Sequence, residues 1–153
     1  MLAVIRVRGS IRAGREFLDT MKMLKLTRVN HLVLFPEKKE IEGMIKKVQS
    51  FVTFGQINEI TFEKLLEKRG KLKGDRKLDK EFLKKTGFNS IKELSKALIE
   101  GRATLRKAGI KEVFRLRPPR KGFERKGIKK TFALGGALGN RREKINELIL
   151  RMI

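Results

Sequence analysis

The most concentrated chemistry in this sequence is positive charge. Residues 115–130 read RLRPPRKGFERKGIKK, with eight Lys or Arg side chains against one Glu. Two prolines and two glycines within the segment disfavour a helix, and like charges this close repel one another. We therefore expect an extended or mobile element that takes its counter-charge from a polyanion, as a docking element for nucleic acid does.

A second group of arginines lies near the start of the chain. Arg8, Arg12 and Arg15 flank the first predicted turn from strand to helix. The guanidinium group forms forked hydrogen bonds with phosphate oxygens. These three residues are therefore candidates for a second contact surface.

Other kinds of site have little support. His31 is the only histidine, and with zero Cys and scattered acids the sequence predicts no metal site, no cofactor and no catalytic residue. The run GGALGN at 135–140 lacks the spacing of a nucleotide-binding loop, and either a tight turn or a backbone-phosphate contact before a helix fits it. Phe123 can stack on a base or pack on the protein, and packing is the favoured interpretation.

Composition separates this chain from disordered polycations. It has 39 Lys plus Arg against 17 Asp plus Glu, a formal net charge of +22, yet 40% of its residues are hydrophobic. That apolar fraction is typical of a folded protein with a basic surface. Arg6 and Arg8 interrupt the first apolar run, and Trp and Tyr are absent, so we expect neither a signal peptide nor membrane association.

Apolar periodicity predicts an α+β core of the order β-α-β-α-β in residues 1–57. Its three strands would form a sheet with both helices on one face. The expected strands cover 2–7, 31–35 and 51–54, and the expected helices cover 15–26 and 37–50.

The remaining residues, 58–153, form a predicted helical extension. A helix over 61–69 has Thr61 as its N-cap, and a helix over 90–100 starts with a capping box at Ser90 and Glu93. A third helix covers 142–152, and Lys68–Lys80 is expected to be a solvated loop. A strand at 111–117 and a return strand at 131–134 predict a hairpin-like basic arm over 111–134, which is here called the arm.

Two sets of residues resemble a known family, the large-subunit ribosomal protein numbered thirty in bacteria, in its longer archaeal and eukaryotic form. The first set covers the core: Thr20-Met21-x-x-Leu24-x-Leu26-x-Arg28-x-x-His31-x-Val33, ten further residues, then Met44-Ile45-x-x-Val48-x-x-Phe51-Val52. The second is specific to the long form: Arg117-Pro118-Pro119-Arg120-x-Gly122, followed by Gly135-Gly136-x-x-Gly139-Asn140-Arg141-x-x-x-Ile145-Asn146. The matches span nearly the whole chain.

The resemblance implies a ferredoxin-like core and a structural, non-enzymatic role in the large ribosomal subunit. It implies binding to large-subunit ribosomal RNA near the 5S RNA, beside neighbouring subunit proteins, as a cytoplasmic, ribosome-bound monomer. Because the first strand starts at Leu2, the archaeal type is the closer one. The residues then predicted to contact RNA are Arg8, Arg12, Arg15, Arg115, Arg117, Arg120, Lys121, Arg125, Lys126, Lys129, Lys130 and Arg141.

From the residues alone, two alternatives compete with ribosomal RNA binding. A chromatin-like DNA-binding protein shares the same electrostatics, although no helix shows the pattern of a recognition helix. An RNA-processing enzyme lacks a nucleophile with its base, a metal cluster and a cofactor loop.

Overall fold

A five-stranded sheet forms the centre of this computed structural model, which describes residues 1–79, 82–83, 88 and 90–153. The strand order is β4-β2-β1-β3-β5. β1 is antiparallel to both β2 and β3, β4 is antiparallel to β2, and β5 is parallel to β3. The strands are β1 (Leu2–Arg6), β2 (His31–Phe35), β3 (Val52–Gln56), β4 (Val113–Arg115) and β5 (Gly139–Asn140).

The predicted three-stranded sheet is therefore the middle of a larger one. Two short strands from beyond residue 57 extend it, β4 at the β2 edge and β5 at the β3 edge. Neither strand exceeds three residues, so neither shows an alternating pattern long enough to predict its pairing. Both parts of the chain thus contribute strands to one sheet. The division of the chain at residue 57 stays a prediction.

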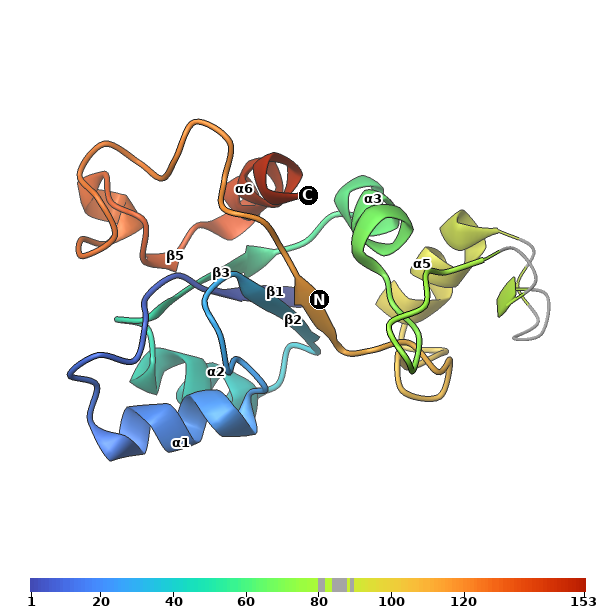
Figure 1. The fold of residues 1–153 in the computed structure, drawn as a ribbon, viewed down its shortest axis with the longest axis horizontal. Helices are drawn as coiled ribbons and strands as arrows, with labels where there is room; N and C mark the ends of the chain where they lie inside the picture. Colours follow the sequence, from blue (N-terminus) through green and yellow to red (C-terminus); the bar gives the residue numbers. More distant parts are fainter. Residues whose placement is uncertain (80–81, 84–87, 89) are drawn as a thin grey trace.

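Two helices cover one face of the sheet, as predicted (Figure 1). They are α1 (Arg15–Met23) and α2 (Lys39–Lys47). Val4 and Val33 on this face pack with Met21 and Ile45 of the helices, and all four side chains are buried. Apolar side chains at helical spacing thus produce the stripe that the sheet buries.

The extension covers the opposite face. Its helices are α3 (Glu59–Arg69), α5 (Ile91–Ile99) and α6 (Ile145–Met152). Ile5 and Leu32 of the sheet pack in one cluster with Phe62 of α3 and Leu148 of α6. Since β1 is covered on both faces, its residues 3 to 6 are all buried, which explains a nearly continuous apolar run rather than strict alternation.

The helix ends show one correction and one confirmation. Thr61 is not the N-cap of α3, because Asn58 holds that position and its side-chain oxygen accepts a hydrogen bond from the Thr61 N–H at 2.8 Å. Thr61 is instead buried. Ser90 caps α5 as predicted, accepting from the Glu93 N–H at 3.1 Å, and Gly101 follows that helix with φ +77°.

The segment expected as a solvated loop is partly structured: its first two residues end α3, and Lys71 forms a bridge with Lys77. Lys80 lies outside the described residues. Leu72 forms a bridge with Ile110. The Asp75 carboxylate forms ion pairs with Lys111 and with Arg115, the latter at 3.4 Å. These contacts fix the loop beside the start of the arm.

The arm is not the two-stranded hairpin predicted from the sequence. Residues 132–134 form a 3₁₀ helix rather than a return strand. Gly135 has φ +84°, and the Gly136 N–H donates to the Thr131 carbonyl at 2.9 Å, so the chain turns immediately after this helix. The turn brings Leu138 beside Thr131 in a parallel bridge, and the arm closes on itself instead of pairing with β4.

Candidate nucleic-acid interface

One end of the sheet collects the loops that carry the predicted contacts. Because neighbouring strands among β1, β2, β3 and β4 are antiparallel, β1 and β4 end where β2 and β3 begin. Arg6 lies opposite Val52, and His31 lies opposite Arg115 at this end. The loop after β1, the loop before β2 and the rest of the arm leave from here, on the left of the view (Figure 1).

Arg6 fixes two of these loops. Its side chain is 3% exposed, and its Nη1 donates to the carbonyls of Leu26 at 2.9 Å and Thr27 at 2.8 Å. Its Nε donates to the Arg8 carbonyl at 2.9 Å, and its Nη2 donates to the Ser10 hydroxyl at 2.6 Å. Burial lowers the pKa of this guanidinium. One buried cation thus orders the loop after β1 and the loop before β2 together.

The predicted group of arginines near the start of the chain extends from the ordered loop. Arg8 donates from Nη1 to the Ser50 carbonyl at 3.1 Å and lies over the Phe51 ring, 5.2 Å from its centroid. Arg12 has φ +58° and is exposed, and Arg15 is the exposed first residue of α1. The exposed guanidinium groups of Arg12 and Arg15 are therefore free to reach a ligand from a loop that Arg6 has already ordered.

Three further basic residues lie near this end, and sequence reasoning did not select them. Lys25, which is paired with Glu112, and Arg28 lie in the loop before β2 and are exposed. Arg69 ends α3, and its pKa is lowered by burial and by the nearby Arg117 charge. The Arg69 Nε is buried without a hydrogen-bond partner. Here we name the partly exposed Arg8 and the exposed cations Arg12, Arg15, Lys25, Arg28, Arg115 and Arg117 the basic end.

His31 lies among these cations rather than in a metal site. Its Nδ1 is 3.4 Å from the Thr27 hydroxyl. Burial lowers the pKa of His31, and the charges of Arg115, Arg28 and Arg6 lower it further. The described residues contain no group of three His, Cys, Asp or Glu side chains that could hold a metal ion.

The arm presents most of its predicted contacts to solvent. It is attached at its start, where the Arg117 N–H donates to the Met152 carbonyl at 2.9 Å and the Arg120 N–H donates to the Arg151 carbonyl at 3.0 Å. Phe123 packs against the core, as favoured from the sequence. The exposed basic residues along the arm are Arg115, Arg117, Arg120, Lys121, Arg125, Lys126, Lys129 and Lys130.

Arg141 requires a correction, because the structure buries it. Its side chain is 2% exposed, and its Nη1 and Nη2 each donate to the Glu124 carboxylate at 2.5 Å. Its Nε donates to the Thr53 hydroxyl at 2.9 Å, and Nη2 also donates to the Ala137 carbonyl at 3.1 Å. All of these donors are used inside the protein, so Arg141 does not belong to the exposed contact surface.

The glycine-rich run before α6 forms a tight turn and a strand, which decides between its two interpretations. Gly139 and Asn140 form β5, and the Asn140 side-chain oxygen accepts from the Arg142 N–H at 2.8 Å. A short 3₁₀ helix over Arg142–Lys144 then separates the run from α6. The run therefore does not sit at the start of the α-helix, where a phosphate would bind.

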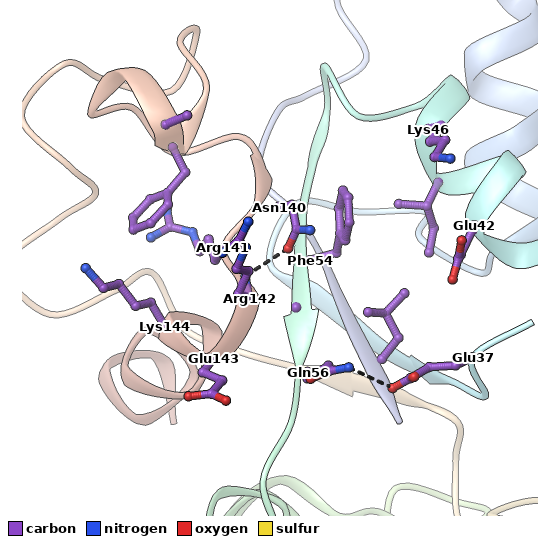
Figure 2. Close-up of a pocket in the computed structure, with 15 residues that line it drawn as sticks. Glu37, Glu42, Lys46, Phe54, Gln56, Asn140, Arg141, Arg142, Glu143 and Lys144 are labelled. Atoms are coloured by element: carbon purple, nitrogen blue, oxygen red, sulfur yellow. Dashed lines mark hydrogen bonds between the residues drawn. The ribbon is translucent and has the colours of Figure 1, made fainter.

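A groove with a volume of about 1080 Å³ lies beside β3. Figure 2 shows Glu42 and Lys46 of α2 on one side, with Arg142 and Lys144 on the other. Acidic and basic side chains both line the groove, and the Glu37 carboxylate forms an ion pair with the N-terminal ammonium at 3.1 Å. The groove has neither the uniform positive charge of a polyanion site nor a base placed beside a nucleophile.

The helices of the described residues are too short and too polar for any of them to cross a membrane.

Comparisons with known proteins agree with this picture. Residues 2–52 match the family model for ribosomal protein L30p/L7e. The chain is 52% identical over 153 residues to the large ribosomal subunit protein uL30 of Nanoarchaeum equitans, covering 100% of this chain and 99% of that one. It is 47% identical over 151 residues to uL30 of Methanococcus maripaludis, covering 99% and 98%. It is 42% identical over 154 residues to uL30 of Methanosphaera stadtmanae, covering 100% of both chains.

Proposed function

The chain belongs to the ribosomal protein L30p/L7e family, and from this premise we propose that the basic end and the arm form its contact surface for ribosomal RNA. As a family member it is a structural constituent of the large ribosomal subunit, it binds ribosomal RNA, and it is not an enzyme. Its place is the ribosome, in the cytoplasm. The predicted archaeal long form is confirmed by archaeal relatives that match along the full chain.

The observation that carries the proposal is the convergence of exposed cations from three separate loops on one end of the sheet. Arg15, Arg28 and Arg115 come from different parts of the chain, yet each lies at or beside the loops that leave this end. Such a surface binds the phosphate backbone by releasing condensed counterions, and it needs no base-specific readers. The part of the chain that the structure describes contains no Tyr or Trp platform for base stacking, so recognition by backbone and shape fits it better.

Within the large subunit, we place the protein near the 5S RNA as a monomer with neighbouring subunit proteins. This placement rests on the long-form motifs between Arg117 and Asn146. The relatives reported above are ribosomal proteins, so the alternative of a chromatin-like DNA-binding protein has no support among them.

Replacing Arg117, Arg120 and Lys121 together by Ala tests the arm. All three side chains are exposed, so we expect an unchanged melting temperature. We expect weaker binding to a structured large-subunit RNA fragment, and a salt slope reduced by about 2 to 3, since each lost phosphate contact removes about one unit. The measurement is an RNA titration at several salt concentrations.

The matched control removes the same charge elsewhere. Lys64 on α3, Lys92 on α5 and Lys107 beyond α5 are also exposed, and their joint replacement by Ala should leave the slope nearly unchanged. Equal losses in the two triple variants would show that net charge alone, rather than this surface, governs binding.

The single histidine offers a spectroscopic test of the basic end. In the free protein the pKa of His31 should lie below its usual 6.5, because of burial and the Arg115, Arg28 and Arg6 charges. Since the unfolded chain binds this proton more readily, the stabilising contribution is complete above about pH 6.5 and is lost as pH falls through the folded pKa.

Bound RNA should move that pKa upward, because phosphates beside Arg28 and Arg115 offset the charges that lower it. The imidazole proton resonance of His31, followed against pH with and without an RNA fragment, measures both values. An unchanged pKa in a saturated complex would place the RNA elsewhere.

A further inference from the structure

Glu124 is the only acidic residue within residues 115–130, the most basic segment of the chain. A free carboxylate there would repel RNA phosphates and weaken binding. Yet its side chain is only 21% exposed, and both of its oxygens accept hydrogen bonds from the buried Arg141, each at 2.5 Å. Arg151 of α6 adds a longer contact at 3.4 Å.

Arg141 in turn connects Glu124 to the sheet. Its Nε donates to the Thr53 hydroxyl of β3 at 2.9 Å, and its backbone N–H donates to the Phe54 carbonyl at 2.8 Å. Its guanidinium lies over the Phe132 ring, 4.5 Å from the centroid. A single side chain therefore joins the middle of the arm, the end of the arm and the edge of the sheet.

We propose that the Glu124–Arg141 pair is a latch that holds the arm in its RNA-binding position, so that an acidic residue strengthens the binding of a polyanion. The proposal rests on the function proposed above, in which the arm contacts RNA. Glu124 and Arg141 are positioning residues and do not themselves touch the RNA.

The remaining contacts of the arm show why its middle depends on this latch. The start of the arm is fixed to α6 through Arg117 and Arg120. Beyond Glu124, the Lys126 N–H donates to the Gly135 carbonyl and the Leu138 N–H donates to the Lys130 carbonyl. The hydrogen bonds of residues 126–138 are therefore formed mainly within this segment. Phe123 also packs against the apolar clusters, and Arg151 donates from Nη1 to the Gly122 carbonyl at 3.2 Å. Among the described residues, the latch adds a buried polar link from the middle of the arm to β3.

The charge state of the pair agrees with this role. Burial of Glu124 acts to raise its pKa, but hydrogen bonds and charge from Arg141, with a further contribution from Arg151, outweigh burial and lower the pKa overall. The carboxylate is therefore ionised at neutral pH, and its charge is answered by two guanidinium groups rather than left facing a ligand.

The test is Glu124→Gln, because it separates two opposite expectations. Removing one negative charge should tighten RNA binding if only electrostatics matters. If the pair is a latch, the variant releases the arm. With the arm in its binding position in only about a tenth of the molecules, the apparent affinity for RNA falls about tenfold, and the salt slope stays the same. Trypsin cleavage after Arg125, Lys126, Lys129 and Lys130 should become faster, which reports the released arm directly.

Glu147→Gln is the matched control, since Glu147 is an exposed acid on α6. It makes the same change in net charge, and it should bind RNA as tightly as the unmodified protein or more tightly. Thr53→Val is a second variant that changes no charge. It removes the Arg141 Nε acceptor and also the hydrogen bond from the Thr53 hydroxyl to the Gly139 carbonyl, and a smaller loss of affinity with faster cleavage is expected.

The outcomes distinguish this inference from the proposed function. Tighter binding by Glu124→Gln, matching Glu147→Gln, with unchanged trypsin cleavage, would overturn the latch. If the Arg117, Arg120 and Lys121 triple variant binds RNA normally, the proposed role of the arm fails instead, while faster cleavage of Glu124→Gln would still show that the pair orders the arm.

Discussion

Raising the salt concentration from about 50 to 200 mM is expected to weaken binding of this protein to ribosomal RNA by about 10³ to 10⁵, if 6 to 10 phosphates are contacted. The basic end and the arm together expose enough Lys and Arg side chains to reach that number. Each contact releases condensed counterions, so the logarithm of affinity should fall linearly with the logarithm of salt concentration. Filter binding or fluorescence anisotropy over this range measures the slope.

A shallow slope would contradict phosphate neutralisation as the basis of binding. Duplex DNA of equal length is the control, because counterion release alone does not separate it from RNA. A preference for structured ribosomal RNA at every salt concentration would show that shape adds to charge.

Replacing Ile45 by Asp is expected to unfold the protein or to lower its free energy of unfolding by more than about 4 kcal/mol. The side chain is 1% exposed and packs between α2 and the sheet with Met21 and Val48. The change removes a packed side chain and buries an unpaired charge. Since typical domains are stable by about 5 to 15 kcal/mol, most of the stability would be lost. Thermal or urea unfolding followed by circular dichroism checks the prediction.

Met44→Asp provides the comparison on the same helix. Met44 is partly exposed, so its new carboxylate can reach water and the loss should be about 1 to 2 kcal/mol. If the Ile45→Asp variant has the melting temperature of the unmodified protein, the Ile45 side chain is not buried between α2 and the sheet as described.

The first 57 residues were predictable because their signals are local. Periods of two and 3.6 residues mark β1 to β3 and the helices α1 and α2, and each stripe is long enough to identify its face. Breaks at Gly9 and Pro36 limit where these elements can extend, whereas β3 continues through Gly55 to Gln56. The burial of β1 on both faces followed from none of this, because it depends on helices that lie beyond residue 57.

The arm and the sheet edges were less predictable because their contacts are distant in sequence. β4 and β5 are two or three residues long, and their partners lie more than 75 residues earlier. The return strand at 131–134 was a reasonable inference from alternation, but the turn at Gly135 leaves no room for it.

Arg141 shows the same limit for the site. Within GNRRE it looks like any exposed cation, and its burial follows from Glu124, which lies 17 residues earlier, and from Thr53, 88 residues earlier. The sequence did not single out Lys25, Arg28 or Arg69, because each lies outside the dense basic segment. Only the fold brings them close to other cations. Charge density predicts that a polyanion binds, while the fold determines which cations can reach it.

Crosslinking of the intact large ribosomal subunit tests the central claim most directly. Ultraviolet crosslinking followed by peptide mapping identifies which residues of this protein lie against RNA. The proposed surface predicts crosslinks concentrated in residues 8–15, 25–31 and 115–130. Crosslinks confined to the outer sides of α3 and α5, with none in these three segments, would contradict it.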